Sequence, residues 1–216
     1  MINKRLGAIV DWIDGQVLAD VGCDHAYVAV QAILKGKVKK SYACDVAKLP
    51  LEHAQTTIDQ YEVGNQVKTI LMDGIQQLPE DVDVIVIAGL GAGTIQTILQ
   101  PQYLKPGIRL ILSPHKDVVD LRKDLSNKPI RIQRERMVYE QGHYYPILDC
   151  IVEKEPSSLK KQEIYMGVNV LKDETYRDYI HFLLKKYTRI LAQIPSKTHP
   201  EFSTHIKYLE KEKESL

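Results

Sequence analysis

The sequence predicts an α/β fold in which a mainly parallel β-sheet carries helices on both faces and ends in an antiparallel hairpin. Three observations support this prediction. Short runs rich in Val and Ile alternate with helical patterns through residue 126, as they do in consecutive βαβ units. Two more apolar runs then follow each other with no helical pattern between them. The C-terminal part has apolar residues spaced three and four apart, which predicts helices.

The same patterns place the individual elements. Five parallel strands are predicted, and their largely apolar character indicates burial on both faces; they span residues 17–21, 41–45, 67–71, 83–88 and 108–113. Helices are predicted between them, at about residues 26–35, 47–62, 74–78 and 93–100. The antiparallel hairpin at one sheet edge is predicted to consist of residues 130–137 and 144–152.

The chain beyond the hairpin is predicted to form a separate helical unit. A polar, irregular connector is expected over residues 153–172. A long helix should follow and stop at Pro195, with an apolar face made of Tyr176, Tyr179, Ile180, Leu183, Leu184, Tyr187, Ile190, Leu191 and Ile194. A final helix is predicted at about 199–213, and its inward face should carry Phe202, Ile206 and Leu209. We therefore expect a first domain of residues 1–154 and a C-terminal helical hairpin within residues 155–216.

The composition indicates a cytoplasmic protein without a membrane span, and we expect a monomer or a weak dimer. The chain has 216 residues, a formal net charge of +1 and no apolar run as long as a membrane helix. Its cysteines, Cys23, Cys44 and Cys150, show no C-x-x-C spacing and the histidines are scattered, so we expect no metal site. The small net charge does not by itself indicate nucleic acid, although it is compatible with local basic patches.

The most informative segment joins the first predicted strand to the helix after it. Residues 18–27 are Leu-Ala-Asp-Val-Gly-Cys-Asp-His-Ala-Tyr. Gly22 would let a ligand approach the backbone, and Asp20 could accept a hydrogen bond from a ligand ammonium group. Asp24 stands where the dinucleotide-binding fingerprint has a glycine, and its carboxylate would repel a pyrophosphate at a helix N-terminus. The segment therefore favours a cationic cofactor without phosphate, S-adenosylmethionine (SAM).

Acidic residues also follow the second and third predicted strands. Asp45 ends the second strand, about where an acid binds the ribose hydroxyls in such folds. Asp73 and Gly74 follow the third strand, where the carboxylate would face an adenine amino group and the glycine would leave room for the ring. Either carboxylate could instead be a simple turn or helix N-cap. Together with Asp20, these acids form one constellation at the carboxyl ends of three strands.

A second glycine-rich turn leaves a dinucleotide cofactor open as an alternative. Residues 84–95 are Val-Ile-Val-Ile-Ala-Gly-Leu-Gly-Ala-Gly-Thr-Ile, again a strand followed by a turn and a helix. Thr94 stands at the position of the third glycine, however, and the next strand ends without an acid for a ribose. With SAM as the cofactor, Ala88 and Gly89 would instead border the methyl group and the acceptor.

These segments resemble a known family, the bacterial tRNA (adenine-22-N1)-methyltransferases, or TrmK family. The first family motif, A-D-I-G-S-D-H-A-Y, is similar to residues 19–27, and its I-A-G-M-G-G segment is similar to residues 87–92. Its R-L-x-x-I, L-R-x-x-L and E-x-G-K-x-Y-E-I segments are similar to residues 5–9, 121–125 and 140–147. The C-terminal helical hairpin is shared as well, so the resemblance spans nearly the whole chain.

Most departures from the family pattern lie on the acceptor side. The family's L-Q-P-N is Leu-Ser-Pro-His in residues 112–115, and Ala92 replaces a glycine. His143 and Pro146 replace a lysine and a glutamate. The family's G-E-V becomes Cys-Asp-Val in residues 44–46, which keeps an acid. Cofactor binding therefore carries over more safely than the identity of the methylated base.

The resemblance implies a Rossmann-like class I SAM-dependent methyltransferase that modifies N1 of an adenine in tRNA and holds tRNA with its C-terminal hairpin. The residues and the resemblance together place at the cofactor Asp20, Gly22, Asp24, His25, Tyr27, Asp45, Val46, Asp73, Gly74, Ala88 and Gly89. They place at the reacting base Asp24, Gly89, Pro114, His115 and Tyr145. Neutral His115 could accept a hydrogen bond from the adenine amine, and a hairpin tyrosine could stack on the base.

Simpler interpretations of these residues, and other functions, stay open. His115 could merely precede a helix, and Tyr145 could merely pack in the hairpin. The chain could methylate another RNA, a protein or a small molecule. It could also be a module that binds the cofactor or RNA without turnover, which the altered residues 113–115 would favour.

Overall fold

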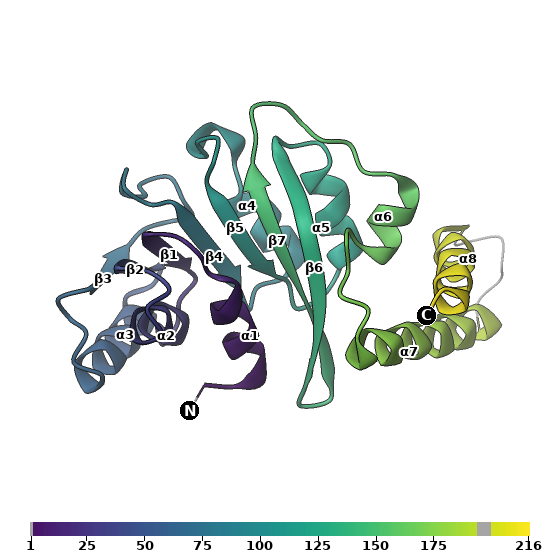
Figure 1. Cartoon of the computed structure of the whole chain (residues 1–216), viewed down its shortest axis with the longest axis horizontal. Coiled ribbons are helices and arrows are strands. Elements are labelled where there is room, and N and C mark those ends of the chain that lie inside the picture. Colours follow the sequence, from purple (N-terminus) through teal and green to yellow (C-terminus); the bar gives the residue numbers. More distant parts are fainter. Residues whose placement is uncertain (1, 194–199) are drawn as a thin grey trace.

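The computed structural model describes residues 2–193 and 200–216, and it contains the predicted seven-stranded sheet (Figure 1). The strands are β1 (Val17–Val21), β2 (Lys40–Asp45), β3 (Val67–Leu71), β4 (Val84–Ala88), β5 (Arg109–Ser113), β6 (Ile130–Glu140) and β7 (His143–Val152). They lie in the order β3-β2-β1-β4-β5-β7-β6, and only the pairs made by β7 are antiparallel. The predicted sheet, with five parallel strands and a terminal hairpin, is confirmed.

Helices cover both faces of the sheet. They are α1 (Lys4–Trp12), α2 (Tyr27–Leu34), α3 (Lys48–Gln60), α4 (Ala92–Ile98), a 3₁₀ turn η1 (Pro101–Tyr103) and α5 (Val118–Leu125). Alternate residues of a strand point to opposite faces, so β4 serves two cores. Val84 and Val86 pack in the core that contains α1, α2 and α3, whereas Ile85 and Ile87 pack in the core that contains α4 and α5.

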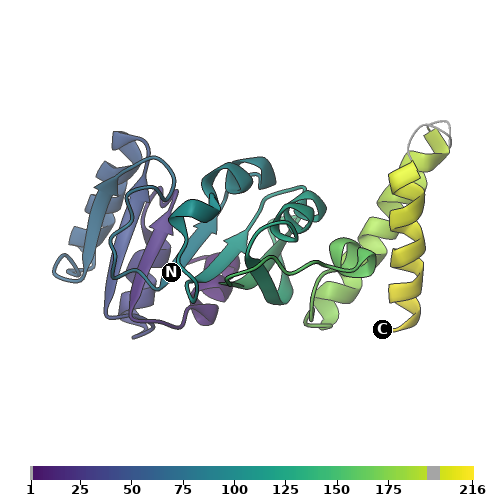
Figure 2. The ribbon, with the colours of Figure 1, turned by 90° about the horizontal axis from the view of Figure 1, so that it is seen from above.

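The C-terminal helices are α6 (Lys161–Met166), α7 (Glu174–Gln193) and α8 (Pro200–Glu214). Figure 2 shows α7 and α8 side by side at one end of the molecule, as the predicted hairpin requires. Tyr176, Ile180 and Leu183 of α7 and Leu209 of α8 are buried, while the predicted inward residues Phe202 and Ile206 are half-buried. The predicted stop at Pro195 and the neighbouring Ile194 lie outside the described residues.

Two predictions about local structure are wrong. The segment 74–78 forms turns rather than a helix, because Gly74 has a φ of +63° and Pro79 follows directly. The connector 153–172 is not irregular throughout, since it contains α6. The N-terminus of α6 is capped where the backbone N–H of Lys160 donates to Glu163 Oε2 at 2.7 Å. In the described parts of the chain, no helix has the length and apolar character that crossing a membrane requires.

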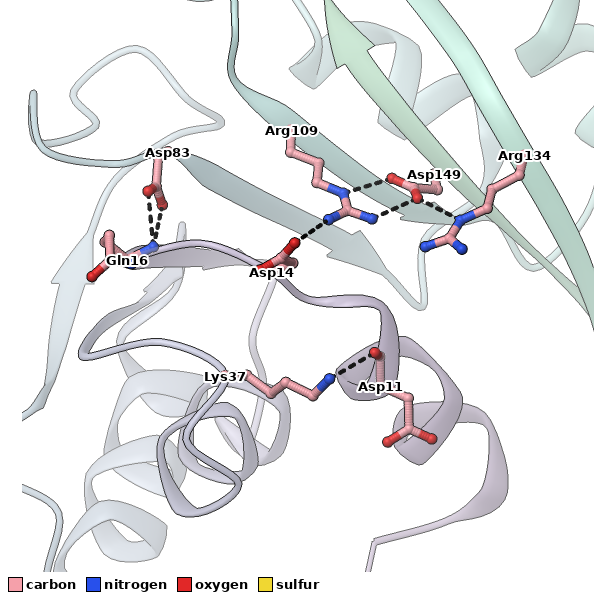
Figure 3. A network of polar contacts seen from close by, with 8 residues as sticks. All are labelled: Asp11, Asp14, Gln16, Lys37, Asp83, Arg109, Arg134 and Asp149. Atoms are coloured by element: carbon pink, nitrogen blue, oxygen red, sulfur yellow. Dashed lines mark hydrogen bonds and ion pairs between the residues drawn. The ribbon is translucent and has the colours of Figure 1, made fainter.

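At the amino ends of the parallel strands, a buried carboxylate is fully compensated by arginines (Figure 3). The side chain of Asp149, 1% exposed, accepts hydrogen bonds from Arg109 Nε and Nη2 at 2.8 and 2.6 Å. Arg134 Nε donates to the same carboxylate at 2.9 Å, and its guanidinium lies over the ring of Trp12. Asp14 also contacts Arg109, with an Oδ2–Nη1 distance of 3.5 Å. These contacts tie the hairpin to β5 and to the end of α1.

A second buried ion pair joins the sheet to the C-terminal helices. Arg122 of α5 and Glu135 of β6 are 3% and 2% exposed, and Nη2 of the arginine lies 2.7 Å from Oε2 of the glutamate. The guanidinium also donates to the carbonyls of Ile164 and Tyr165 in α6, at 3.1 and 3.3 Å. Glu135 in turn accepts from the backbone N–H of Val168 at 2.9 Å. One ion pair thus holds three segments that are distant in sequence.

Removing one partner of this pair should destabilise the protein strongly, because the other charge stays buried without compensation. We expect Arg122→Ala to lower the free energy of unfolding by about 3–5 kcal/mol. The neighbouring Lys123 forms an exposed pair with Asp120, and Lys123→Ala should cost less than about 1 kcal/mol. Urea denaturation of both variants measures the difference, and equal losses would contradict this role of the ion pair.

Candidate active site

A cavity of about 400 Å³ opens at the carboxyl ends of β1, β2 and β4, which is the edge where open α/β sheets bind ligands. Its volume is within the range of small-molecule sites. The cavity draws its walls from α1, from the β1–α2 turn and from the segments that follow β2, β4 and β5. Its lining residues are Arg5, Leu6, Asp20, Gly22, Cys23, Asp24, His25, Tyr27, Val28, Asp45, Pro50, Ala88, Gly89, Leu90 and His115.

The β1–α2 turn is shaped by residues in the left-handed backbone region. Gly22 has a φ of +75°, and a Cβ there would lie 3.3 Å from Leu90 Cδ1, so glycine is favoured on both counts. The N–H groups of Gly22 and Cys23 both donate to the carbonyl of Cys44, at 2.9 and 3.1 Å. Asp24 also has a positive φ, of 45°. The turn is therefore fastened to the end of β2, next to Asp45.

Asp20 is the buried carboxyl group of the cavity. Its residue is 4% exposed, and burial raises the pKa of its carboxyl from 3.8 to about 7. The negative charge of Asp45 raises this pKa further, while a backbone hydrogen bond involving Ala29 acts in the opposite direction. Asp149 is paired with two arginines, whereas no lysine or arginine of the described chain is among the causes that shift the pKa of Asp20. A cationic ligand would supply the missing compensation, and a phosphate would not.

The thiols beside this carboxyl group stay protonated. Burial raises the pKa of Cys23 far above its ordinary value and that of Cys44 to about 12, and the nearby Asp20 raises both further. A protonated thiol is a poor nucleophile and a poor metal ligand. Cys23 therefore acts as a small apolar wall residue of the cavity, and Cys44 and Cys150 are buried as well.

Most of the predicted cofactor residues line the cavity, but three of them do not. Asp45 lines it and also caps its own turn, because its Oδ1 accepts from the N–H of Ala47 at 3.0 Å. Val46, Asp73 and Gly74 lie outside the lining, and Val46 is 68% exposed. The roles of these three residues stay predictions. Asp73 follows β3, which is separated from β1 by β2.

Arg5 and His115 line the cavity near the end of β5, and Tyr145 packs against both of them. Arg5 Nη1 lies 3.5 Å from His115 Nε2, and its guanidinium lies 4.7 Å from the centre of the Tyr145 ring. The rings of His115 and Tyr145 meet edge to face at 5.6 Å. Burial and the charge of Arg5 lower the pKa of His115, which favours the neutral imidazole. Tyr145 and the predicted Pro114 do not line the cavity themselves.

Asp24 and His25 line the same cavity and lie next to His53 of α3, although the sequence suggested that the histidines are scattered. His25 Nε2 lies 3.6 Å from Asp24 Oδ2, and His53 Nδ1 lies 3.9 Å from Asp24 Oδ1. The two imidazole rings stack with their centres 4.9 Å apart, and Tyr27 lies against the outer face of His25. All of these side chains are partly exposed or exposed. Asp24, His25 and Tyr27 form a polar, aromatic rim of the cavity, and His53 packs against it.

Sequence reasoning missed several lining residues. Arg5 and Leu6 reach the cavity because α1 packs beside the hairpin, where the N–H of Lys4 donates to Glu140 Oε1 at 2.6 Å. The R-L-x-x-I segment at residues 5–9 was a signal for them, but it did not indicate where α1 lies. The other missed residues are Cys23 and Leu90 within the quoted motifs, Val28 directly after the first motif, and Pro50 in α3.

The raised pKa of Asp20 predicts a specific pH dependence of stability. The folded protein keeps the proton of Asp20 up to about pH 7, whereas the unfolded chain loses it near pH 3.8. The stability that this proton provides is therefore present at low pH and is lost as the pH rises from 4 to 7. Asn does not titrate, so Asp20→Asn does not lose this stability. The difference in free energy of unfolding between the variant and the wild type should therefore shift by about 4 kcal/mol in favour of the variant as the pH rises from 4 to 7.

Denaturation of both proteins at several pH values tests this, and parallel profiles would refute the shifted carboxyl. Asp81→Asn is the control. A hydrogen bond from Lys40 lowers the pKa of Asp81, so its stabilisation is present at neutral pH and is lost only at acidic pH.

Comparison with known proteins identifies the domain. A family model described as a methyltransferase domain matches residues 2–148. The tRNA (adenine(22)-N(1))-methyltransferase of Bacillus subtilis is 29% identical over 151 residues, a match that covers 68% of this chain and 63% of that protein.

Two solved structures share the whole fold. The structure of TrmK from M. capricolum, in complex with S-adenosyl-homocysteine, has a TM-score of 0.85 and 28% identity, and the match covers 99% of this chain and 98% of that one. TrmK from B. subtilis shares the fold, with a TM-score of 0.77 and 23% identity. The match covers 99% of this chain and 96% of that one. The chain therefore belongs to the methyltransferase-domain family and, within it, to the TrmK family.

Proposed function

We propose that this protein is a SAM-dependent methyltransferase that methylates N1 of adenine 22 in tRNA, as the name of its Bacillus subtilis relative describes for that protein. The observation that carries the proposal is the buried carboxyl of Asp20, which lies in the cavity without a compensating cation. The amino acid end of SAM offers an ammonium group, and its sulfonium adds a second positive charge. The M. capricolum relative binds the corresponding product, S-adenosyl-homocysteine.

The residues around the cavity can be assigned to the parts of this cofactor. Asp20 would bind the ammonium group, and Asp45 the ribose hydroxyls, at the ends of neighbouring strands. Gly22 and Ala88 would let the ligand lie against the backbone. The adenine ring would lie toward Val46, Asp73 and Gly74, and the polar rim of Asp24, His25 and Tyr27 would border the methionine part. When bound, the cofactor supplies an electrophilic methyl group on sulfur.

The protein's own residues would position the acceptor base. Adenine N1 has an in-plane lone pair, so no side chain needs to remove a proton before methylation. The base must be held about 3–3.5 Å from the methyl group and in line with it. Neutral His115 suits this role, because it can accept a hydrogen bond from the exocyclic amine without opposing the positive charge that develops on the ring. The carbonyl of Gly89 and the carboxylate of Asp24 would add further acceptors.

Tyr145 and Pro114 would act from behind this wall. The ring of Tyr145 contacts the ring of His115 edge to face and lies under the guanidinium of Arg5, so it would fix the orientation of both side chains. Pro114 sets the chain direction between β5 and His115. Because the Watson–Crick edge of adenine is hidden in paired RNA, the base must be unpaired or flipped out of its stack to reach the cavity. We place the protein with its RNA substrate in the cytoplasm, and the monomer or weak dimer stays a prediction.

Methyl transfer to a defined RNA tests the proposal. Purified protein should transfer methyl groups from labelled SAM to a tRNA transcript with adenine at position 22, and digestion should release 1-methyladenosine. A transcript with guanine at that position should receive none, because its N1 carries a proton. Methylation of another nucleoside would support a different RNA substrate, and cofactor binding without any transfer would support a non-catalytic module; either result would contradict the proposed activity.

A further inference from the structure

A second cavity, which we call the aromatic groove, lies between the sheet and the C-terminal hairpin and also has a volume of about 400 Å³. Its lining residues come from the start of α5, from the β6–β7 turn with the start of β7, and from α6, α7 and α8. His115 lines both this groove and the proposed cofactor cavity, so the two spaces adjoin at one residue. The two spaces can therefore hold neighbouring parts of one ligand.

Aromatic rings form much of the wall of the groove. Phe182 of α7 is 48% exposed and packs on Tyr144 of β7, with the ring centres 5.3 Å apart. Tyr144 also packs against the half-buried Tyr179, with the ring centres 5.3 Å apart, which fixes its position. Farther along α7, Tyr187 lies 4.8 Å from the ring of His205 in α8. Half-exposed aromatic rings beside a cavity are the surfaces on which unpaired nucleic acid bases stack.

His205 adds a polar group that is buried and has no partner. The residue is 6% exposed, and its Nε2 makes no hydrogen bond within the described structure. Burial is the main reason that its pKa is lowered to about 4, and the charges of Arg122 and Lys123 lower it further. At neutral pH the ring therefore offers a neutral nitrogen. A buried nitrogen without a partner is unfavourable unless a ligand satisfies it.

The charges around the groove favour a base over a phosphate inside it. Its lining contains both lysines and acids, and Lys123 is paired with Asp120 at 3.1 Å. Lys116 and Lys186 form no ion pair among the described residues, and the ammonium of Lys186 lies 6.0 Å from the centre of the Tyr187 ring. These two lysines can contact backbone phosphates of the chain outside the groove, while the uncharged rings contact the base.

We propose that the aromatic groove binds a second unpaired base of the RNA substrate, next to the base that enters the cofactor cavity. The base stacks against Phe182, which Tyr144 supports from behind, and its polar edge bonds to Nε2 of His205. This inference rests on the proposed function, because it takes the substrate to be RNA. It gives the C-terminal hairpin a role in recognising a base, beyond a general attraction for phosphate.

Photo-crosslinking tests where the second base lies. A tRNA transcript with adenine 22 is prepared with 5-iodouridine at unpaired positions and irradiated with the full-length protein. We expect crosslinks in the peptides that contain Tyr144, Phe182 or Tyr187, identified by mass spectrometry. Crosslinks found only outside these peptides, or no complex with the RNA at all, would overturn the proposal.

Binding by variants provides the second test. Phe182→Leu removes the stacking surface, and His205→Phe keeps a ring while it removes Nε2; each should weaken tRNA binding about tenfold. Affinity for SAM should stay unchanged in both. Tyr103→Leu is the control, because Tyr103 is an exposed aromatic residue of η1 outside the groove. If the two groove variants retain normal melting temperatures and bind tRNA as tightly as Tyr103→Leu does, the proposal is wrong.

The two proposals can fail separately. Methylation at a nucleoside other than adenine 22, together with crosslinks in the groove, would contradict the proposed activity and support the groove. Methylation of adenine 22 without groove crosslinks would support the activity and overturn only the inference about the second base.

Discussion

The buried ion pair between Arg122 and Glu135 is the contact on which the arrangement of the two parts of the chain depends. Two charges in a dry environment are stable only with near-complete hydrogen bonding, and here the remaining donors and acceptors are used by the backbone of α6 and of Val168. The backbone of Gly167 packs closely beside this ion pair, and there is no room for a side chain at this position, because a Cβ would lie 2.6 Å from Val170 Cγ2. These contacts fix the position of the C-terminal helices relative to the sheet. They therefore also fix the shape of the aromatic groove between them.

Two buried carboxyl groups have opposite surroundings, and the difference distinguishes a structural role from a functional one. Asp149 at the amino ends of the strands is bonded to two arginines, and its contribution is to hold the hairpin (Figure 3). Asp20 at the carboxyl ends has a raised pKa and faces a cavity. A carboxyl group that is kept in an unfavourable environment without a compensating cation indicates a site where a ligand provides one. Asp20 is therefore the residue that best indicates the charge of the cofactor.

Much of the architecture could be predicted because it depends on local patterns. The strand sequences are continuously apolar, and Gly22 and Asp20 stand where a βα turn needs them, so the sheet and the first wall of the cavity followed from the sequence. The helix predicted for the segment 74–78 is wrong because five residues are too few for an apolar period that separates a helix from turns. Arg5 and the groove could not be predicted, because they arise where distant elements meet: α1 against the hairpin, and α7 with α8 against β7.

The central claim is that the cavity binds a cation-bearing cofactor and rejects a diphosphate. Calorimetric titration with S-adenosyl-homocysteine and with NAD⁺ tests it most directly, because the two ligands share an adenosine and differ in the charge beyond it. We expect S-adenosyl-homocysteine to bind to the wild-type protein and NAD⁺ to show no binding. The Asp45→Ala variant should bind S-adenosyl-homocysteine at least about tenfold more weakly. Tighter binding of NAD⁺, or an unchanged affinity in Asp45→Ala, would contradict the account.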